Sequence, residues 1–268
     1  MTAIGFKRTI WLYYRRFGRR FLWRKTRDPY RILVSEIMLQ QTQAGRVKEK
    51  YPEFLRTFPT VRSLARAPLS RVLRAWQGMG YNRRALFLKK IAATILKKFN
   101  GRVPSSQEKL ESLPGIGHAT ASAIRAFAFN APGVFIETNI RRVFIHFFFA
   151  NKKKVSDKEI LPLVKKTLDR AHPREWYWAL MDYGTMLGEK RENPNRKSAH
   201  YARQAPFRGS RRELRGRILR VLLAHSAQTE KSIVRLTKAR AGIARDVLAG
   251  LLRDRLIKKR RGLFSISS

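Results

Sequence analysis

Cysteine is absent from this sequence, acidic residues are scarce, and every apolar run is short. Without a thiol, the chain cannot form a disulfide, a thiolate zinc site or a cysteine-ligated iron–sulfur cluster. No apolar run approaches the roughly 18 to 20 residues that cross a membrane. The run at residues 10–14 is interrupted by Arg15 and Arg16, which argues against a secretory signal. We therefore expect no membrane partner.

The shortage of acidic residues leaves a large excess of positive charge. Only 18 Asp and Glu residues stand against 59 Lys and Arg residues among 268, which gives a formal net charge of +41. Basic residues occur in nearly every segment, so they do not form an appended tail. A field of this sign favours a polyanionic partner, and nucleic acid fits better than a membrane surface. A generally basic proteome would also explain the charge, but not the motifs described below.

Apolar residues recur with helical spacing along nearly the whole chain, which predicts an all-α fold. Asp28 and Pro29 form a helix-start pattern, an N-cap acceptor followed by proline in the first turn. We expect Thr42 to cap the next helix and Thr138 to cap a later one. Further helices are predicted at residues 4–17, 82–99, 106–114, 118–129, from 156 onward, and at 176–187.

A change in composition divides the chain. Residues 191–210 are rich in Asn, Pro, Arg and Ser and lack periodic apolar residues, which predicts a linker or docking loop. We therefore predict a first domain at residues 1–190 and a second at 211–268. The second domain reads as three short helices followed by two strands that meet at Arg261 and Gly262. This order is typical of a winged-helix-like module, a helix-turn-helix variant that binds DNA. A small helical cap on the first domain is the alternative.

A carboxylate lies inside an apolar helical stretch in the first half of the chain. Glu36 is preceded by Ile32 and Leu33 and followed by Ile37 and Met38. Such surroundings raise the pKa of a carboxyl group by desolvation, so Glu36 could hold a proton near neutral pH. A pair of glutamines follows this stretch after one more leucine.

A tight hairpin between two helices is predicted farther along, where Leu113 is followed by Pro-Gly-Ile-Gly. Gly115 and Gly117 permit a turn that side chains would block, and the amides beside the helix that begins near His118 can hold a phosphate. A second carboxylate, Glu137, stands just ahead of another helix start.

In this order and spacing, the two segments resemble the helix-hairpin-helix (HhH-GPD) DNA glycosylases, and among these the MutY-type adenine glycosylases. The resemblance runs from about Trp23 to about Gly188. It implies a helix-hairpin-helix glycosylase fold and base excision repair, in which the N-glycosidic bond of an adenine opposite guanine or 8-oxoguanine is hydrolysed. The implied partner is double-stranded DNA with a mismatch or lesion. We expect a monomer in the cytoplasm, at the nucleoid if the source is prokaryotic.

The resemblance gives each carboxylate a role. Cleavage of an N-glycosidic bond needs a proton on the departing base and negative charge facing an oxocarbenium-like sugar. Glu36 matches the family's proton donor, and Glu137 stands where the family has the aspartate that stabilises the sugar cation. The additional methylene of Glu137 moves the carboxylate by about a bond length, a displacement that matters for rate. We expect an adjusted pocket, because the flanking residues keep the family pattern.

The resemblance also implies the DNA contacts. Gln40, Gln41 and Tyr81 match residues that enter the duplex near the mispair, where an extruded base leaves a gap. Further contacts, mainly to phosphates, are expected from Arg83, Arg84, Gly115, Gly117, His118, Asn139, Arg141 and Arg142.

Two departures from the family bear on chemistry. Members that also nick the strand have lysine where this chain has Ala119, so no amine is present for a Schiff base and the resemblance implies a monofunctional enzyme. Many relatives carry a four-cysteine iron–sulfur cluster, but Gly188 stands where the first cysteine would be. We expect no cluster, no metal and no other cofactor, and something else must hold that corner together.

Two other functions stay open. A thymine or uracil glycosylase acting on mismatches with guanine is one, because Ala119 and Glu137 lie in or near the pocket. A catalytically silent lesion-binding protein is the other, although a binder gains nothing from a desolvated carboxylic acid. The segment after residue 190 is shorter than the domain that reads 8-oxoguanine in many adenine-specific relatives. We therefore expect weaker discrimination between guanine and 8-oxoguanine.

Overall fold

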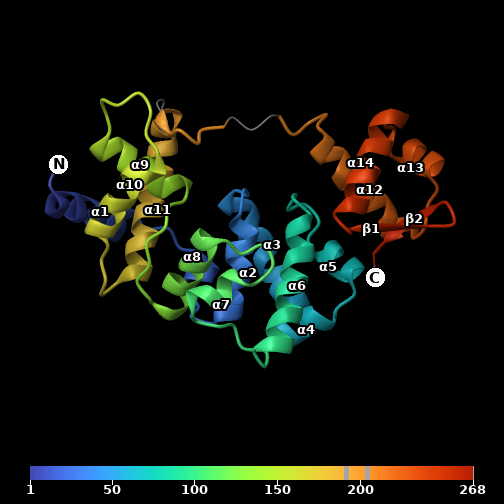
Figure 1. Ribbon diagram of the computed structural model, residues 1–268, viewed down its shortest axis with the longest axis horizontal. Helices are drawn as coiled ribbons and strands as arrows, with labels where there is room; N and C mark the ends of the chain where they lie inside the picture. Colours follow the sequence, from blue (N-terminus) through green and yellow to red (C-terminus); the bar gives the residue numbers. More distant parts are fainter. Residues whose placement is uncertain (190–192, 203–205, 268) are drawn as a thin grey trace. The chain divides into compact units, whose positions relative to one another are not determined.

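The computed structural model describes residues 1–189, 193–202 and 206–267, and within them the regular structure is helical apart from two short strands (Figure 1). The predicted all-α class is confirmed. Contacts divide the chain into two compact units. The first consists of residues 1–36, 105–112 and 116–203, and the second of residues 37–104, 113–115 and 204–268.

The two compact units are not delimited at residues 190 and 211. Those predicted domain limits stay a prediction. Part of the predicted linker, residues 191–192 and 203–205, lies outside the described residues. Among the described residues, no helix combines the length and the apolar character of a membrane span.

The first unit packs around an aromatic core. The ring centroid of the buried Phe6 lies 5.2 Å from that of Phe144 and 6.0 Å from that of Trp176, so three helices distant in sequence meet at one point. The elements of this unit are α1 (Ala3–Phe17), the 3-10 helix η1 (Leu22–Arg24), α7 (Gln107–Glu111), α8 (His118–Phe129), α9 (Thr138–Phe148), α10 (Asp157–Thr167), α11 (Pro173–Glu189) and the 3-10 helix η2 (Pro194–Lys197). A further helix, α2 (Pro29–Leu39), runs from the first unit into the second.

The second unit has a core of its own. Phe54 and Trp76 are fully buried, with ring centroids 5.8 Å apart. Most apolar residues of α6 (Arg83–Lys98), among them Ile91 and Ile95, are buried as well. The elements before the C-terminal module are α3 (Ala44–Thr57), α4 (Val61–Arg66), α5 (Leu69–Ala75) and α6 (Arg83–Lys98).

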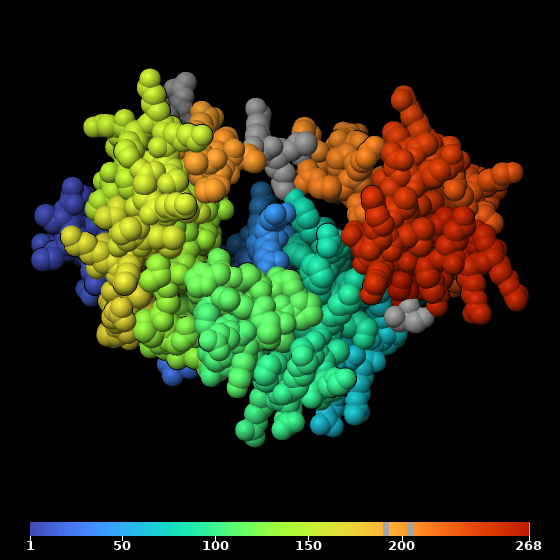
Figure 2. Space-filling model, in the orientation of Figure 1, coloured from blue at the N-terminus to red at the C-terminus, as the bar shows by residue number. Residues whose placement is uncertain are grey.

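The C-terminal elements of this unit have the predicted order. Three helices are followed by an antiparallel hairpin whose innermost pair is Arg260 and Leu263. Arg261 and Gly262 have φ of 48° and 78°, which is the two-residue turn that matches the twist of a hairpin. In Figure 2 these elements form one continuous orange-to-red mass. They are α12 (Arg211–His225), α13 (Glu230–Thr237), α14 (Ala241–Arg253), β1 (Ile257–Arg260) and β2 (Leu263–Ile266).

Two predicted helix caps are wrong. Gln43, and not Thr42, is the N-cap of α3, and the Thr42 hydroxyl instead donates to the Met79 carbonyl at 3.4 Å. Glu137, and not Thr138, is the N-cap of α9. Helices α4 and α5 were not predicted, and both belong to the second unit.

Candidate functional site

Glu36 lies on α2 between Ser35 and Ile37, each 1% exposed. The helix begins where the sequence predicts, because Asp28 Oδ1 accepts the Tyr30 amide at 2.8 Å. Glu36 keeps partial solvent access by surface area, yet the protein around it desolvates the carboxyl group.

Three influences set the pKa of Glu36. Burial is the largest, the negative charge of Glu137 adds to it, and the positive charge of Arg24 opposes both. Together they raise the pKa of Glu36 from 4.5 to about 8. The side chain is therefore mostly protonated near neutral pH and can donate that proton.

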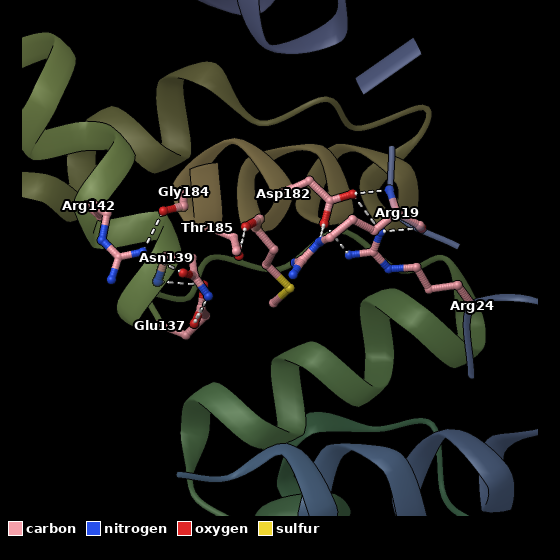
Figure 3. A network of polar contacts seen from close by, with 9 residues as sticks. Arg19, Arg24, Glu137, Asn139, Arg142, Asp182, Gly184 and Thr185 are labelled. Atoms are coloured by element: carbon pink, nitrogen blue, oxygen red, sulfur yellow. Dashed lines mark hydrogen bonds and ion pairs between the residues drawn. The ribbon is translucent and has the colours of Figure 1, made fainter. Parts of the chain in front are cut away.

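Glu137 is held at the N-terminus of α9. Its Oε1 accepts the Ile140 backbone amide at 2.9 Å. Figure 3 shows its contacts with Asn139, whose backbone amide donates to Oε1 at 2.8 Å and whose side-chain amide donates to Oε2 at 3.3 Å. Burial raises the pKa of Glu137, whereas the two backbone amides and then the charges of Arg142 and Arg141 lower it. Amides and helix dipole both favour a carboxylate here. Two carboxylates in such different surroundings can divide the roles of acid and anion.

Arg142 orients the side chain of Asn139, which in turn donates to Glu137. Its Nη1 donates to Asn139 Oδ1 at 2.9 Å and to the Gly184 carbonyl at 2.5 Å (Figure 3). Its Nε donates to Asn193 Oδ1 at 3.0 Å. Because Asn139 gives its carbonyl oxygen to Arg142, its amide nitrogen faces Glu137. Arg142 thus acts within the protein in this structure, and its predicted phosphate contact stays a prediction.

Two glycines of α11 make this arrangement possible. A Cβ on Gly184 would overlap the Asn139 carbonyl, and a Cβ on Gly188 would overlap the Arg142 guanidinium. At Gly188, where a cysteine ligand was considered from the sequence, the space is filled by Arg142. The 3-10 helix η2, which follows α11 in the chain, is fixed to the start of α9, since Asn195 Nδ2 donates to the Thr138 carbonyl at 2.9 Å. Polar contacts therefore hold this corner.

A buried ion-pair cluster lies in the same unit as the two carboxylates, and it was not predicted from the sequence. Asp182 is 2% exposed, and its two oxygens accept from Arg24 at 2.7 Å and 2.8 Å and from Arg19 Nε at 2.6 Å (Figure 3). The cluster fixes the guanidinium of Arg24, whose charge acts on Glu36. The sequence places Asp182 six residues before Gly188 in the last helix of the first domain, but it does not show which groups Asp182 would bind.

The predicted hairpin is present, but only one of its two glycines has a backbone conformation that requires glycine. Gly115 has φ of 78°, and a side chain there would press on the Phe87 ring at 2.9 Å. Gly117 has φ of −96°, a conformation open to any residue, and is the N-cap of α8. His118 is exposed and its Nδ1 lies 2.9 Å from Glu111 Oε1. The amides at the start of α8, next to a residue without a side chain, suit an anion.

The predicted wedge residues share an unusual backbone. Gln41 follows α2 and Tyr81 precedes α6, and their φ angles are 53° and 45°. Non-glycine residues seldom take the left-handed conformation, and they keep it when the surroundings enforce it, often at functional sites. Gln40 lies beside Gln41 at the end of the same helix.

Arg84 holds the loop after α2, which contains Gln41, and the loop before α6, which contains Tyr81. It is 7% exposed, and its Nη1 donates to the carbonyls of Ile37, Met38 and Gln40 while its Nη2 donates to those of Met79 and Gly80. Burial lowers its pKa to about 10, so it stays charged near neutral pH. This location favours tying the loops together over a direct contact with phosphate.

The other predicted basic contacts also have partners in the protein. Arg141 makes a bidentate ion pair with Asp157 at 2.7 Å for each bond. Arg83 is exposed, and its Nε lies 3.4 Å from Asp254. Their contacts with DNA stay predictions. In the described part of the chain, no group of three or more His, Asp or Glu side chains is arranged to hold a metal ion.

Comparison with known proteins places these residues in a family context. A family model described as "HhH-GPD superfamily base excision DNA repair protein" matches residues 34–167. The chain is 38% identical over 192 residues to the adenine DNA glycosylase of Buchnera aphidicola subsp. Baizongia pistaciae, covering 70% of this chain and 54% of that protein. It is 30% identical over 185 residues to the thymine/uracil-DNA glycosylase of Methanothermobacter thermautotrophicus, covering 68% of this chain and 84% of that protein.

A solved structure described as a thermostable thymine-DNA glycosylase matches with a TM-score of 0.65 at 28% identity, covering 73% of this chain and 91% of that one. The chain thus spans about half the length of the first of these relatives (54%) and most of the length of the other two.

Proposed function

Because the chain belongs to the HhH-GPD superfamily of base excision DNA repair proteins, we propose that it is a DNA glycosylase that removes adenine mispaired with guanine or 8-oxoguanine. The observation that carries this proposal is the pair of carboxylates. Glu36 has a pKa of about 8 beside Glu137, which is held by the amides of α9. These are the acid and the anion that cleavage of an N-glycosidic bond needs.

In the proposed reaction, protonated Glu36 donates its proton to a ring nitrogen of the extruded adenine. The bond between C1′ and the base then breaks, and its electron pair leaves with the neutral base. The Glu137 carboxylate faces the positive charge that develops on the sugar, and a water adds to C1′ and loses a proton. The products are free adenine and an abasic site. A pKa near the working pH suits a general acid.

We propose adenine as the substrate in preference to a pyrimidine because Glu36 can donate a proton to the departing base. Protonation makes adenine a good leaving group, whereas thymine and uracil can leave as stabilised anions and depend less on a proton donor. The sequence match to adenine DNA glycosylases supports the same choice. A donor with a raised pKa also argues against a catalytically silent binder.

A thymine or uracil glycosylase acting on mismatches with guanine is the second candidate. Two observations favour it, the similarity to the thymine/uracil-DNA glycosylase and the structural match to the thymine-DNA glycosylase. Ala119, at the exposed start of α8, supports hydrolysis without strand cleavage for either substrate.

We further propose one DNA contact within each unit, at the start of α8 in the first and at the two loops bonded to Arg84 in the second. The amides after Gly117 would bind a phosphate, and Gln40, Gln41 and Tyr81 would enter the duplex. The C-terminal module would add charge along the duplex. We propose that the protein acts as a monomer on double-stranded DNA with a mismatch or lesion. It would do so in the cytoplasm, and at the nucleoid if its source is prokaryotic.

The test is Glu36→Gln, which keeps the shape of the side chain and removes its acidic proton. We expect single-turnover adenine excision to vanish while the Kd for mismatched duplex stays within about twofold, because the phosphate contacts are untouched. Glu49→Gln, an exposed glutamate on α3, is the matched control and should excise like the wild type. Wild-type turnover by the Glu36 variant would refute the assigned role.

A further inference from the structure

A second pocket of the second unit, which we call the α6–β1 pocket, is lined by α6 and by the segment that joins α14 to β1. Its volume is about 430 Å³, inside the range of roughly 300 to 1,000 Å³ typical of ligand sites. Buried apolar side chains, among them Leu69 and Ile257, form part of the lining. Among the described residues that line it there is no carboxylate, whereas four are cations, namely Lys89, Lys90, Arg255 and Lys258.

Arg255 has a backbone conformation that usually belongs to glycine. Its amide donates to the Leu252 carbonyl at 2.9 Å, and the next amide, of Leu256, donates to the Leu251 carbonyl at 3.1 Å. These two bonds form a Schellman motif at the end of α14, and glycine is usual at the position that Arg255 takes because φ is positive there. Arg255 has φ of 56°. Strain of this kind persists where the surroundings enforce it, and it is common at ligand sites.

Helix α6 supplies two neighbouring cations to the pocket. Lys89 is half-buried, its Nζ donates to the Ala65 carbonyl at 2.9 Å, and burial lowers its pKa. Lys90, the next residue, is exposed. One ammonium group is thus fixed in the wall, and the other stands at the mouth of the pocket.

The chain beside the pocket is uniformly basic, whereas the charges on α14 are balanced. Residues 255–268 contain five Lys and Arg residues and no Asp or Glu. On α14, Arg245 Nε lies 3.1 Å from Glu230, and Asp246 lies 3.0 Å from Arg211. A polyanion is therefore attracted more strongly to the pocket and the hairpin than to the exposed face of α14.

The lining fits the phosphate and sugar of a nucleic-acid backbone. Phosphate oxygens accept from guanidinium and ammonium groups together, and these charge-assisted bonds are strong. The apolar part of the lining can pack against the carbon face of a deoxyribose. Among the described residues that line the pocket none is aromatic, so a base has no flat face on which to stack.

We propose that the α6–β1 pocket binds a phosphate of the DNA backbone, with Arg255 and Lys90 as donors, and that the C-terminal module contacts DNA here and not along α14. DNA is named as the polyanion because the inference rests on the proposed function. A helix-turn-helix variant would ordinarily present its recognition helix to the bases. Phosphates carry no sequence information, so this contact strengthens binding to every sequence alike.

The experiment measures the Kd of a fully paired duplex between about 0.05 and 0.2 M salt. Arg255→Gly and Lys90→Ala should each weaken binding about fivefold and reduce the salt slope of log Kd by about 1, as the loss of one phosphate contact does. Arg255→Gly should not lower the Tm, because glycine takes this backbone conformation without strain. Its loss of affinity is then not a loss of folded protein.

Each variant has a matched control that loses the same charge outside the pocket. Lys97→Ala removes an exposed lysine about two turns farther along α6. Arg245→Ala removes the exposed arginine of α14. Both should change the Kd by less than about twofold. An unchanged Kd and salt slope in Arg255→Gly and Lys90→Ala would overturn the inference, and so would a larger loss in Arg245→Ala, which would place the DNA on α14.

Inorganic phosphate distinguishes a DNA phosphate from a free one. If it raises the Tm of the wild type but not of Arg255→Gly, while the two proteins bind DNA equally, the pocket is a site for free phosphate and the DNA assignment is wrong. Failure of the proposed function is separable, because the duplex in this test contains no mismatch. If the wild type releases no base, a lower affinity of the two pocket variants still supports the inference.

Discussion

Substitution of Gly188 by alanine tests whether the Arg142 guanidinium fills the space between α9 and α11. The added Cβ would overlap the Arg142 guanidinium, which must then leave Asn139, Gly184 and Asn193. Hydrogen bonds from a charged donor contribute about 1.5–3 kcal/mol each, and the displaced group regains water. We therefore expect the free energy of unfolding to fall by about 2–4 kcal/mol.

The same substitution should slow catalysis. Once Arg142 moves, Asn139 loses its orientation and Glu137 loses a hydrogen bond to its Oε2. A displacement of a reacting group by about 1 Å can lower a rate about a hundredfold. We expect kcat to fall between about tenfold and a hundredfold, because the Glu137 carboxylate faces the reacting sugar in the proposed reaction.

A double-mutant cycle measures the coupling, with urea unfolding and single-turnover excision as the two assays. In an Arg142→Ala background the overlap is gone, so Gly188→Ala should be neutral or stabilise by up to about 1 kcal/mol, as alanine does in a helix. Gly216→Ala is the control, since a Cβ there meets no described atom within 4 Å. Equal costs of Gly188→Ala in both backgrounds would refute the reasoning.

Three further predictions concern the carboxylates and the reaction products. Excision should decline as pH rises through about 8, because Glu36 then loses the proton it donates. The stability of the wild type relative to Glu36→Gln should fall as pH rises from 4.5 to about 8, because over this range the unfolded chain releases the Glu36 proton while the folded protein still binds it. A flat rate profile through pH 8 contradicts the raised pKa. Glu137→Asp should keep measurable activity in a glycosylase assay, whereas Glu137→Gln should be severely impaired, and full activity of the latter argues against a role for the anion. Borohydride should trap no covalent adduct with DNA, and strand breaks should appear only after alkali, because Ala119 offers no amine; efficient trapping would show a lyase.

The sequence predicts what depends on local spacing. The helix at residues 118–129 and the helix start at Asp28 follow from capping and periodicity, and both are present. The cap of α9 was misassigned because threonine is the commoner N-cap, while the longer side chain of Glu137 also reaches the two free amides. Its carboxylate is therefore both a structural cap and the candidate catalytic anion.

Contacts between distant residues could not be predicted. Arg84 reads as one basic residue among many, and only the fold shows that it is buried and bonded to two loops. The pairing of Arg142 with the space above Gly188, 46 residues away, is likewise set by the packing of two helices. Periodicity shows which face of a helix is buried, but not which polar group it meets.

The identity of the released base tests the central claim most directly. Wild-type protein should be incubated, under single-turnover conditions, with duplexes that carry adenine opposite guanine or 8-oxoguanine, and thymine or uracil opposite guanine, and the free bases should be quantified. The proposed acid Glu36 predicts adenine release from both adenine duplexes, faster than release of either pyrimidine, and none from the Glu36→Gln variant. Faster removal of thymine or uracil opposite guanine would contradict the adenine assignment and establish the second candidate in its place.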